Sequence, residues 1–150
     1  MTTNYLVFLL SGRLFGVKLD GAIEILPWRP SRPVPLAYSY VEGLLDYRGV
    51  VYPVFNIARQ LGMVKPAEPI GFIADESAGS RGGQSIILLE ANKNPFGIIV
   101  DSVVKMTPLT SLTASTAKPQ GVDPKFVQGL VYEDDQEIMI LDGERLLHAG

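Results

Sequence analysis

Apolar segments in this chain are short, and each is bounded by residues that break regular structure. Runs rich in Val, Ile, Leu, Tyr and Phe recur along the chain, separated by Gly, Pro, Asn and Asp. Runs of this kind between turn-forming residues are typical of β-strands. No stretch has the apolar spacing of a long amphipathic helix, which excludes βαβ architectures and the Rossmann class. The chain is therefore predicted to be all-β.

Eleven segments are predicted to be strands, although neighbouring segments could form one bent strand. They are residues 5–10, 14–19, 23–27, 42–48, 50–55, 70–74, 85–91, 95–100, 103–107, 128–132 and 137–141. Tight breaks at 11–12, 48–49, 92–94 and 134–135 predict hairpins, so successive strands are expected to be antiparallel neighbours. Many short strands favour closed or nearly closed barrels, because closure removes exposed sheet edges. The sequence itself indicates no internal repeat.

Two short helices are expected. The first covers residues 56–61, with Asn56 as its N-cap and Gly62 just beyond its end. The second runs from Gly143 or Glu144 to Leu147. Residues 76–84 and 113–125 are predicted to be surface connections, and the first of these is Gly-rich and expected to be mobile.

The composition indicates a folded protein without covalent cross-links. The 150 residues are 47% hydrophobic and 19% charged, which argues against disorder and suits one compact domain or two small intertwined lobes. With no cysteine, disulfides and Cys-based metal sites are excluded, and a reducing cytosol is compatible. No secretory signal is evident, and no apolar run approaches the roughly 20 residues of a membrane helix. A cytoplasmic protein without direct membrane insertion is expected.

Charge and residue types also argue against nucleic-acid binding and catalysis. The net charge is −3, and Arg29, Arg32 and Arg48 are scattered rather than clustered, so no nucleic-acid partner is expected. The single histidine, His148, lies close to the C-terminus, where chains fray. Asp101 is a single carboxylate and not a catalytic pair. No enzyme activity, metal or cofactor is predicted, and a role in recognition remains.

Three further motifs carry weaker alternatives. The acidic residues near 133–137 match no EF-hand spacing and indicate a solvated hairpin tip. The Gly-rich residues 79–83 lack the Walker spacing of a phosphate-binding loop. The Pro-rich residues 27–35 could form polyproline II for an SH3-like groove, but a structural crossing segment is the favoured interpretation.

Four segments together give a positive assignment. They are residues 5–10 with 15–25, residues 41–57, residues 95–103, and residues 126–142 with Leu146 and Leu147. In order and spacing they resemble the CheW family, the coupling proteins of bacterial chemosensory arrays. The second segment is the most specific, since it is similar to the family stretch Gly-x-x-Asn-Leu-Arg-Gly-x-x-x-Pro-Val-x-Asp-Leu.

The resemblance implies both a fold and a function. The fold would be two intertwined five-stranded SH3-like β-barrels with short helices over a shared hydrophobic seam. Residues 1–150 would form a single CheW-like domain, with residues 14–67 as the first barrel and residues 68–147 plus the N-terminal strand as the second. The function would be that of a scaffold or adaptor, which couples the cytoplasmic tips of methyl-accepting chemoreceptors to the regulatory domain of a CheA-type histidine kinase.

The resemblance also implies which residues face the receptor: Ala22, Glu24, Gly43 and Arg48. On a hairpin beside a glycine, the Arg48 guanidinium can make directed hydrogen bonds to carbonyls or carboxylates of a receptor helix. Gly43 would let a partner helix approach the backbone closely. The alternatives are a plain turn arginine for Arg48, a bulge or bend for Gly43 and an ordinary exposed strand charge for Glu24.

The implied kinase-facing residues are Gln84, Ser85 and Ile86, where the family uses exposed apolar surface of a barrel. Core packing is the alternative for Ile86. The sequence departs from the family pattern on the receptor side, because Asp46 and Tyr47 stand in place of Asn-Leu and Ala22 replaces a larger aliphatic residue. These departures leave open an adaptor for a related non-chemotaxis array, such as one for twitching motility or surface sensing. A small-ligand-binding β-barrel sensor is a further alternative.

Overall fold

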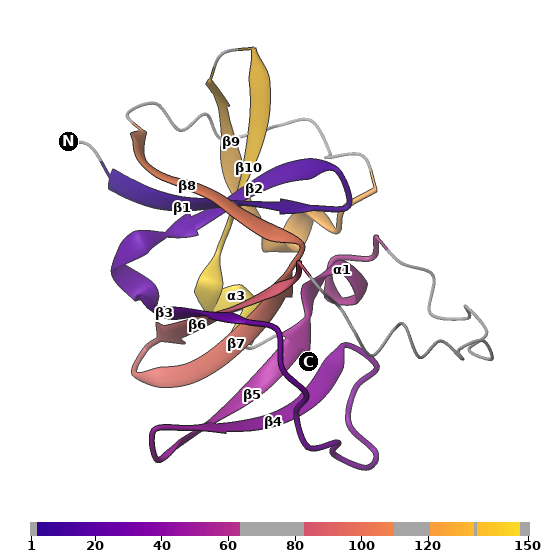
Figure 1. The fold of residues 1–150 in the computed structure, drawn as a ribbon. Helices are drawn as coiled ribbons and strands as arrows, with labels where there is room; N and C mark the ends of the chain where they lie inside the picture. Colours follow the sequence, from indigo (N-terminus) through magenta and orange to yellow (C-terminus); the bar gives the residue numbers. More distant parts are fainter. Residues whose placement is uncertain (1–2, 64–82, 110–120, 134, 148–150) are drawn as a thin grey trace.

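The structure is a computed structural model that describes residues 3–63, 83–109, 121–133 and 135–147. Within these residues ten strands form two five-stranded sheets (Figure 1). The first sheet has the order β8-β1-β2-β10-β9 and the second has the order β3-β6-β7-β5-β4. No helix in the described ranges is long and apolar enough to cross a membrane.

The strand bounds follow the predicted segments closely. The strands are β1 (Thr3–Leu10), β2 (Arg13–Lys18), β3 (Ala22–Pro27), β4 (Val41–Tyr47), β5 (Val50–Asn56), β6 (Ser85–Ala91), β7 (Asn94–Val100), β8 (Ser102–Leu109), β9 (Val127–Glu133) and β10 (Gln136–Leu141). Ten of the eleven predicted strands are confirmed, and the eleventh, residues 70–74, lies outside the described residues.

The helices are short. They are α1 (Ile57–Gln60), α3 (Gly143–Leu147) and the 3-10 turns η1 (Leu19–Gly21) and η3 (Pro124–Phe126). The predicted cap of the first helix is confirmed, because the Asn56 side chain accepts a hydrogen bond from the Arg59 amide at 3.2 Å. Asp142 caps α3 in the same way, accepting from the Glu144 amide at 3.0 Å.

The hairpins explain why the chain reverses where it does. Ser11 and Gly12 both have positive φ, as do Arg48 and Gly49, and Asn92 and Lys93. Two successive residues with positive φ form the turn whose twist matches that of paired antiparallel strands. The four predicted hairpins are confirmed by the antiparallel pairs β1–β2, β4–β5, β6–β7 and β9–β10. Two parallel pairs, β2–β10 and β5–β7, complete the sheets.

The two halves of the chain have the same architecture and exchange parts. In the first half β1 and β2 join one sheet, while β3, β4 and β5 join the other. In the second half β6 and β7 join the sheet of β3, and β8, β9 and β10 join the sheet of β1. The pairing registers are equivalent too: Phe8 lies opposite Val103, and Leu89 lies opposite Ala22, each beside a bulge. This structural repeat is not evident as a repeat of residues.

The exchange corrects the expected lobe boundaries. Strand β2, placed in the first barrel by the 14–67 boundary, pairs with β1 in the other sheet. Strands β6 and β7, placed in the second barrel, belong to the sheet of β3, β4 and β5. The physical reason is that β3 and β8 each pair with the hairpin of the opposite half, so a sequential boundary cannot separate the sheets.

Side chains link the two outer strands of each sheet at equivalent positions. In the first sheet, Lys105 of β8 forms an ion pair with Glu133 of β9. In the second sheet, the Tyr47 hydroxyl of β4 donates to Glu24 Oε2 of β3 at 2.5 Å. Each pair connects the two edge strands of its sheet, so each sheet curves round to bring its edges together. Both contacts act as barrel closures.

Three apolar clusters fill the part of the molecule that the structure describes. One lies within the second sheet and includes Leu26, Val54 and Ile86, and another lies within the first sheet and includes Tyr5 and Val7. The largest cluster draws on both sheets and is the shared seam. Strand β1 shows the arrangement clearly, since Tyr5 and Val7 belong to one cluster while Leu6 and Phe8 belong to the seam. A strand buried on both faces reads as a continuous apolar run.

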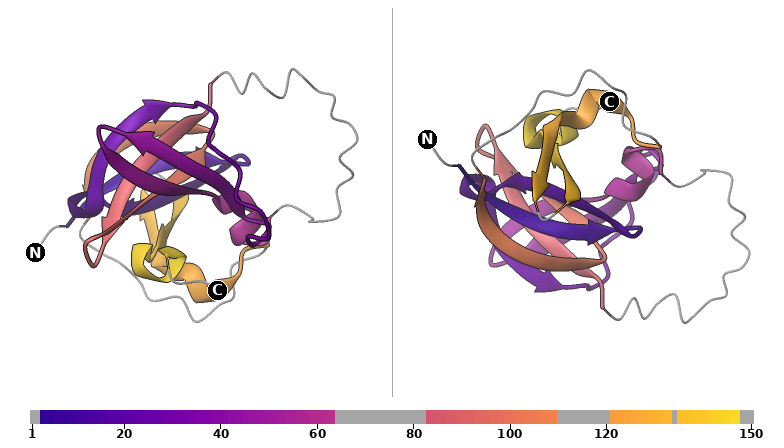
Figure 2. Two further views of the ribbon diagram at one scale, coloured as in Figure 1. Left: turned by 90° about the horizontal axis from the view of Figure 1, so that it is seen from below. Right: turned by 90° about the horizontal axis from the view of Figure 1, so that it is seen from above.

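The β4–β5 and β9–β10 hairpins lie at opposite ends of the molecule, with the seam between them (Figure 1). Figure 2 views the molecule from below, with the β4–β5 end toward the reader, and from above, with the β9–β10 end toward the reader. Each hairpin contributes one residue to a closure: Tyr47 to the contact with Glu24, and Glu133 to the contact with Lys105. The structure therefore has two equivalent ends with different side chains.

Ile86 provides a test of this core. Its side chain is 0% exposed within the second sheet, whereas Ile23 of the neighbouring strand β3 is 46% exposed. We expect Ile86→Ala to lower the free energy of unfolding by about 2–5 kcal/mol, because it removes buried methyl groups and leaves a cavity. The matched control Ile23→Ala should cost less than about 1 kcal/mol. Urea unfolding measures both, and equal losses would contradict this packing.

Candidate functional site

Tyr47 lies at the centre of a charged cluster at the end of the second sheet. It is the last residue of β4, next to the turn formed by Arg48 and Gly49. Its hydroxyl donates to Glu24, and the guanidinium carbons of Arg29 and Arg48 lie 5.6 Å and 5.2 Å from its ring centroid. Both distances are within the range of a cation–π contact.

Arg48 is held loosely and remains open to solvent. Its Nη1 lies 3.8 Å from Glu24 Oε1, and its side chain is 74% exposed. An exposed pair at that distance contributes little stability, so it orients the guanidinium without fixing it. The Glu24 side chain is 34% exposed and has two partners, which corrects the view of it as an ordinary exposed strand charge.

Two of the three arginines described as scattered in the sequence converge on Tyr47, and the third pairs with the neighbouring Asp46. Arg29 contacts the Tyr47 ring, and Arg32 Nη2 forms an ion pair with Asp46 Oδ2 at 3.1 Å. Arg48 contacts both Tyr47 and Glu24. The convergence arises because residues 28–40 return across β4, where Arg32 and Leu44 exchange two backbone hydrogen bonds of 2.8 Å.

Gly43 has a different structural role from the one expected. A Cβ built at Gly43 would lie 2.4 Å from the Arg32 carbonyl oxygen and 2.6 Å from Ser31 Oγ. The chain's own segment, rather than a partner helix, therefore uses the close approach that glycine allows. The alternative of a bulge is confirmed, because the register of β4 against β5 shifts between Val41 and Gly43. Gly43 is buried and positions Arg32 above β4.

Ala22 lies at the start of β3, two residues before Glu24. It is partly buried against the shared seam and pairs with Leu89. Of the four expected receptor residues, Glu24 and Arg48 are in contact, while Gly43 acts through the backbone beneath Arg32. The sequence reasoning missed that Tyr47 and Arg29 form one cluster with Glu24 and Arg48. The departure from Leu at position 47 was the available signal.

The three expected kinase residues differ sharply in accessibility. Gln84 donates to Asp101 Oδ1 at 3.1 Å, and Ser85 begins β6; both are partly exposed. Ile86 is fully buried inside the second sheet, so it has no surface to offer a partner. The alternative of core packing is confirmed for Ile86, because side chains alternate along β6 and this one points inward.

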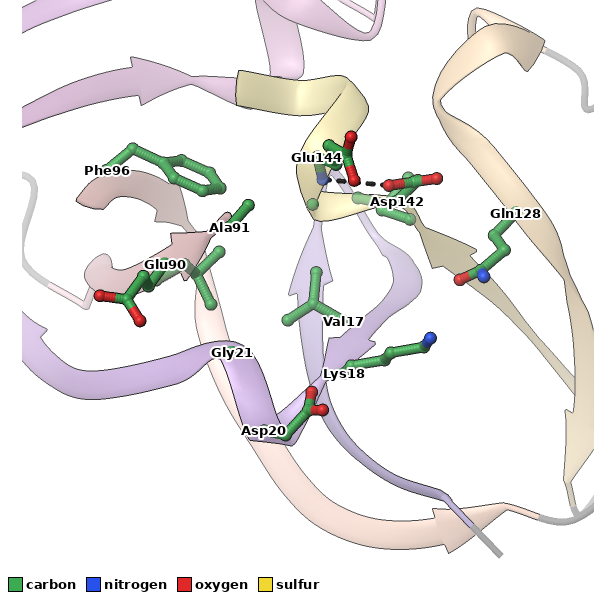
Figure 3. A pocket seen from close by; sticks show the side chains of 13 residues that line it. Val17, Lys18, Asp20, Gly21, Glu90, Ala91, Phe96, Gln128, Asp142 and Glu144 are labelled. Carbon is green, nitrogen blue, oxygen red and sulfur yellow. Dashed lines mark hydrogen bonds between the residues drawn. The ribbon is translucent and has the colours of Figure 1, made fainter. Parts of the chain in front are cut away.

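A cavity of about 270 Å³ lies between strands of both sheets (Figure 3). Lys18, Asp20, Glu90 and Glu144 are among its lining residues. Figure 3 shows Asp142 and Glu144 next to each other, while Asp20 and Glu90 lie apart from them. The described residues contain no group of three or more metal-ligating side chains. Asp101, which was weighed as a catalytic acid, instead accepts from the Ser11 amide at 2.8 Å and from Gln84.

The CheW-like domain model matches residues 4–150, which is nearly the whole chain. This chain belongs to the CheW-like family. The chemotaxis protein CheW of Treponema pallidum is 24% identical over 145 residues, covering 95% of this chain and 80% of that protein. The chemotaxis protein CheW of Rhizobium meliloti is 31% identical over 98 residues, covering 65% of this chain and 56% of that protein.

The crystal structure of the scaffolding protein TtCheW from Thermoanaerobacter tengcongensis is similar to this structure. The TM-score is 0.79 at 24% sequence identity, and the alignment covers 97% of this chain and 88% of that one. The expected fold class, two intertwined five-stranded SH3-like β-barrels with short helices, is thereby confirmed.

The contact between Tyr47 and Glu24 affects the pKa of the Tyr47 phenol. The hydrogen bond to the Glu24 carboxylate raises the pKa of Tyr47 above its ordinary value. We expect Glu24→Gln to lower the pKa of Tyr47, because a neutral amide no longer favours the protonated phenol. Since the pKa is raised in the folded state, the contact stabilises the fold at neutral pH and this stabilisation disappears as pH rises through that pKa.

Ultraviolet absorbance of tyrosinate, compared between the protein and its Tyr47→Phe variant, isolates this one phenol. Tyr132 supplies the control, because its pKa is raised by Glu137 at the other end of the molecule. Glu137→Gln should leave the titration of Tyr47 unchanged. An unaltered Tyr47 titration in Glu24→Gln would contradict the contact.

Proposed function

We propose that this chain is an adaptor that couples the cytoplasmic tips of chemoreceptors to a CheA-type histidine kinase in chemotaxis signalling. The observation that carries the proposal is the family match over residues 4–150, together with the same fold as a scaffolding CheW protein. The described residues offer exposed recognition surfaces. The adaptor is proposed to act in the cytoplasm, without cofactors, and to reach the membrane through receptors.

The receptor surface is proposed to be the end of the second barrel around Arg48 and Glu24. Arg48 has a φ of 52°, a left-handed conformation that suits Asn or Gly better than a long side chain. Such a residue costs on the order of 1 kcal/mol relative to the right-handed region. An exposed guanidinium kept at that cost supports a binding role, since nothing in the core depends on it.

The kinase surface is proposed to include Gln84 and Ser85, which lie at the start of β6 beside the backbone of Trp28. Ile86 is left out, because it is buried. The end of the first barrel has the exposed apolar character that the resemblance implies for kinase docking: Val104 and Met106 on β8 are 48% and 60% exposed, and Tyr132 on β9 is 65% exposed. Because the β9–β10 hairpin lies at the opposite end from the β4–β5 hairpin, both partners could bind at once (Figure 1).

Arg48→Glu tests the receptor surface. We expect it to abolish recruitment by a receptor cytoplasmic fragment, because a carboxylate would meet the acceptors that Arg48 is proposed to bind. Binding to the CheA regulatory domain, expected to be micromolar, should stay within about twofold. Lys93→Glu is the matched control, since Lys93 is also a hairpin-tip cation with positive φ. Unchanged receptor pull-down, with folding intact, would overturn the role of Arg48.

Ser85→Arg tests the kinase surface. A bulky charge at the start of β6 is expected to weaken binding of the CheA regulatory domain at least tenfold, about 1.4 kcal/mol, and to leave receptor binding unchanged. Ser39→Arg, at an exposed serine, is the control. Isothermal titration calorimetry measures both. If Ser85→Arg binds the CheA regulatory domain fully and Met106→Glu does not bind it, the kinase surface lies on β8 and β9 instead.

The pathway served is a separate question with its own readout. An adaptor for a related array, such as one for twitching motility or surface sensing, would bind the same classes of partner and differ in which receptor it recruits. A small-ligand sensor would instead show a thermal shift with a metabolite and no kinase binding. Asp46 and Tyr47, which differ from the family pattern, lie at the proposed receptor surface. A change of receptor is expected to alter residues at this surface.

A further inference from the structure

The cluster around Tyr47 contains more cations than carboxylates. Arg32 is paired with Asp46 at 3.1 Å, and Glu24 is shared between the Tyr47 hydroxyl and Arg48. Within the described part of the chain, no carboxylate lies within 4.0 Å of the Arg29 guanidinium. The guanidinium contacts the Tyr47 ring instead. With Arg32 and Asp46 paired to each other, Arg29 and Arg48 against Glu24 make this end locally positive on a chain whose net charge is −3.

Two guanidiniums share the face or edge of one ring. Because Arg29 and Arg48 lie 5.6 Å and 5.2 Å from the same centroid, their separation cannot exceed the sum of those distances. Like charges at such a spacing repel each other, and a pair of carboxylates placed between them would relieve the repulsion. Carboxylates four residues apart on a helix lie side by side and reach across a comparable span.

Tyr47 keeps Arg48 available to such a ligand. The hydroxyl occupies Glu24 Oε2, and the remaining oxygen lies 3.8 Å from Arg48, beyond hydrogen-bonding distance. A leucine, which the resembling family pattern has at this position, could neither donate to Glu24 nor offer a π face to a cation. Glu24 would then be free to neutralise Arg48.

We propose that Arg29, Tyr47 and Arg48 form a clamp for two carboxylates on one face of a partner helix. Arg29 and Arg48 bind the carboxylates. Tyr47 is a positioning residue that orients both guanidiniums and takes Glu24 Oε2 as its acceptor, so that Glu24 keeps only its 3.8 Å ion pair with Arg48. The inference rests on the proposed function, since the partner helix is that of the receptor tip. It adds Arg29 as a contact and acidic side chains as the feature that the clamp selects.

The test titrates a receptor cytoplasmic fragment against the full-length protein over a series of salt concentrations. We expect Arg29→Ala to weaken binding about five- to tenfold and to reduce its salt dependence, because one charge-assisted contact is lost. Arg59→Ala is the matched control, since Arg59 is an exposed arginine on α1 outside the cluster. It should change neither quantity.

Tyr47 is tested by two variants. Tyr47→Leu should weaken binding about fivefold, and Tyr47→Phe, which keeps the ring but loses the hydroxyl, should lose less. Adding Glu24→Gln to Tyr47→Leu should restore binding, because Arg48 then has no competing carboxylate; a purely structural role for Tyr47 would give no such rescue. Urea unfolding midpoints confirm that each variant folds.

A fragment variant completes the design. Each acidic residue of the receptor tip is changed in turn to its amide. We expect the changed fragments to bind the wild-type protein more weakly than the unchanged fragment does. At one of these positions, the changed and unchanged fragments should bind Arg29→Ala equally. Arg29→Ala binding like wild type, while Arg48→Glu does not bind, would overturn the clamp and leave the adaptor function standing. Wild-type protein that binds neither the receptor fragment nor the CheA regulatory domain would overturn the adaptor function itself.

Discussion

The exchange of β3 and β8 between the two sheets is the constraint on which the rest of the structure depends. Each of these strands pairs with the hairpin from the other half of the chain, so neither barrel is complete without both halves. The exchange places β1 and β6 where both faces of each strand are buried. One face of each strand packs inside a barrel, and the other packs in the shared seam. A rigid body with two barrel ends follows, and the functional surfaces are built on those ends.

The two ends share a design and differ in chemistry. At equivalent positions a side-chain contact joins the outer strands, through Lys105 and Glu133 in one barrel and through Glu24 and Tyr47 in the other. The first contact is a self-contained ion pair beside exposed apolar side chains. The second leaves Arg29 and Arg48 with unused donor capacity around an aromatic ring. A duplicated scaffold thus carries one apolar end and one cationic end, which suits the binding of two unlike partners.

Local features of the fold could be predicted from the sequence, and non-local ones could not. Strand periodicity, hairpin residues and the Asn56 cap act over a few residues, and the structure confirms them. The strand exchange joins residues as distant as Phe8 and Val103, which no local pattern records. The arginine cluster was missed for the same reason, since residues 28–40 return over β4. Gly43 and Ile86 fit the family pattern by position, yet burial decides what each can contact.

The strand exchange also affects how the chain is made. Strand β1 emerges from the ribosome long before β8, its neighbour in the finished sheet, so its outer edge stays unpaired through much of synthesis. Contacts between segments so distant in the sequence slow folding, because a large loop must close before any stabilising interaction is gained. The β4–β5 hairpin needs only its own turn and can form early. The end of the molecule that carries Arg48 can therefore take shape before the body that holds it exists.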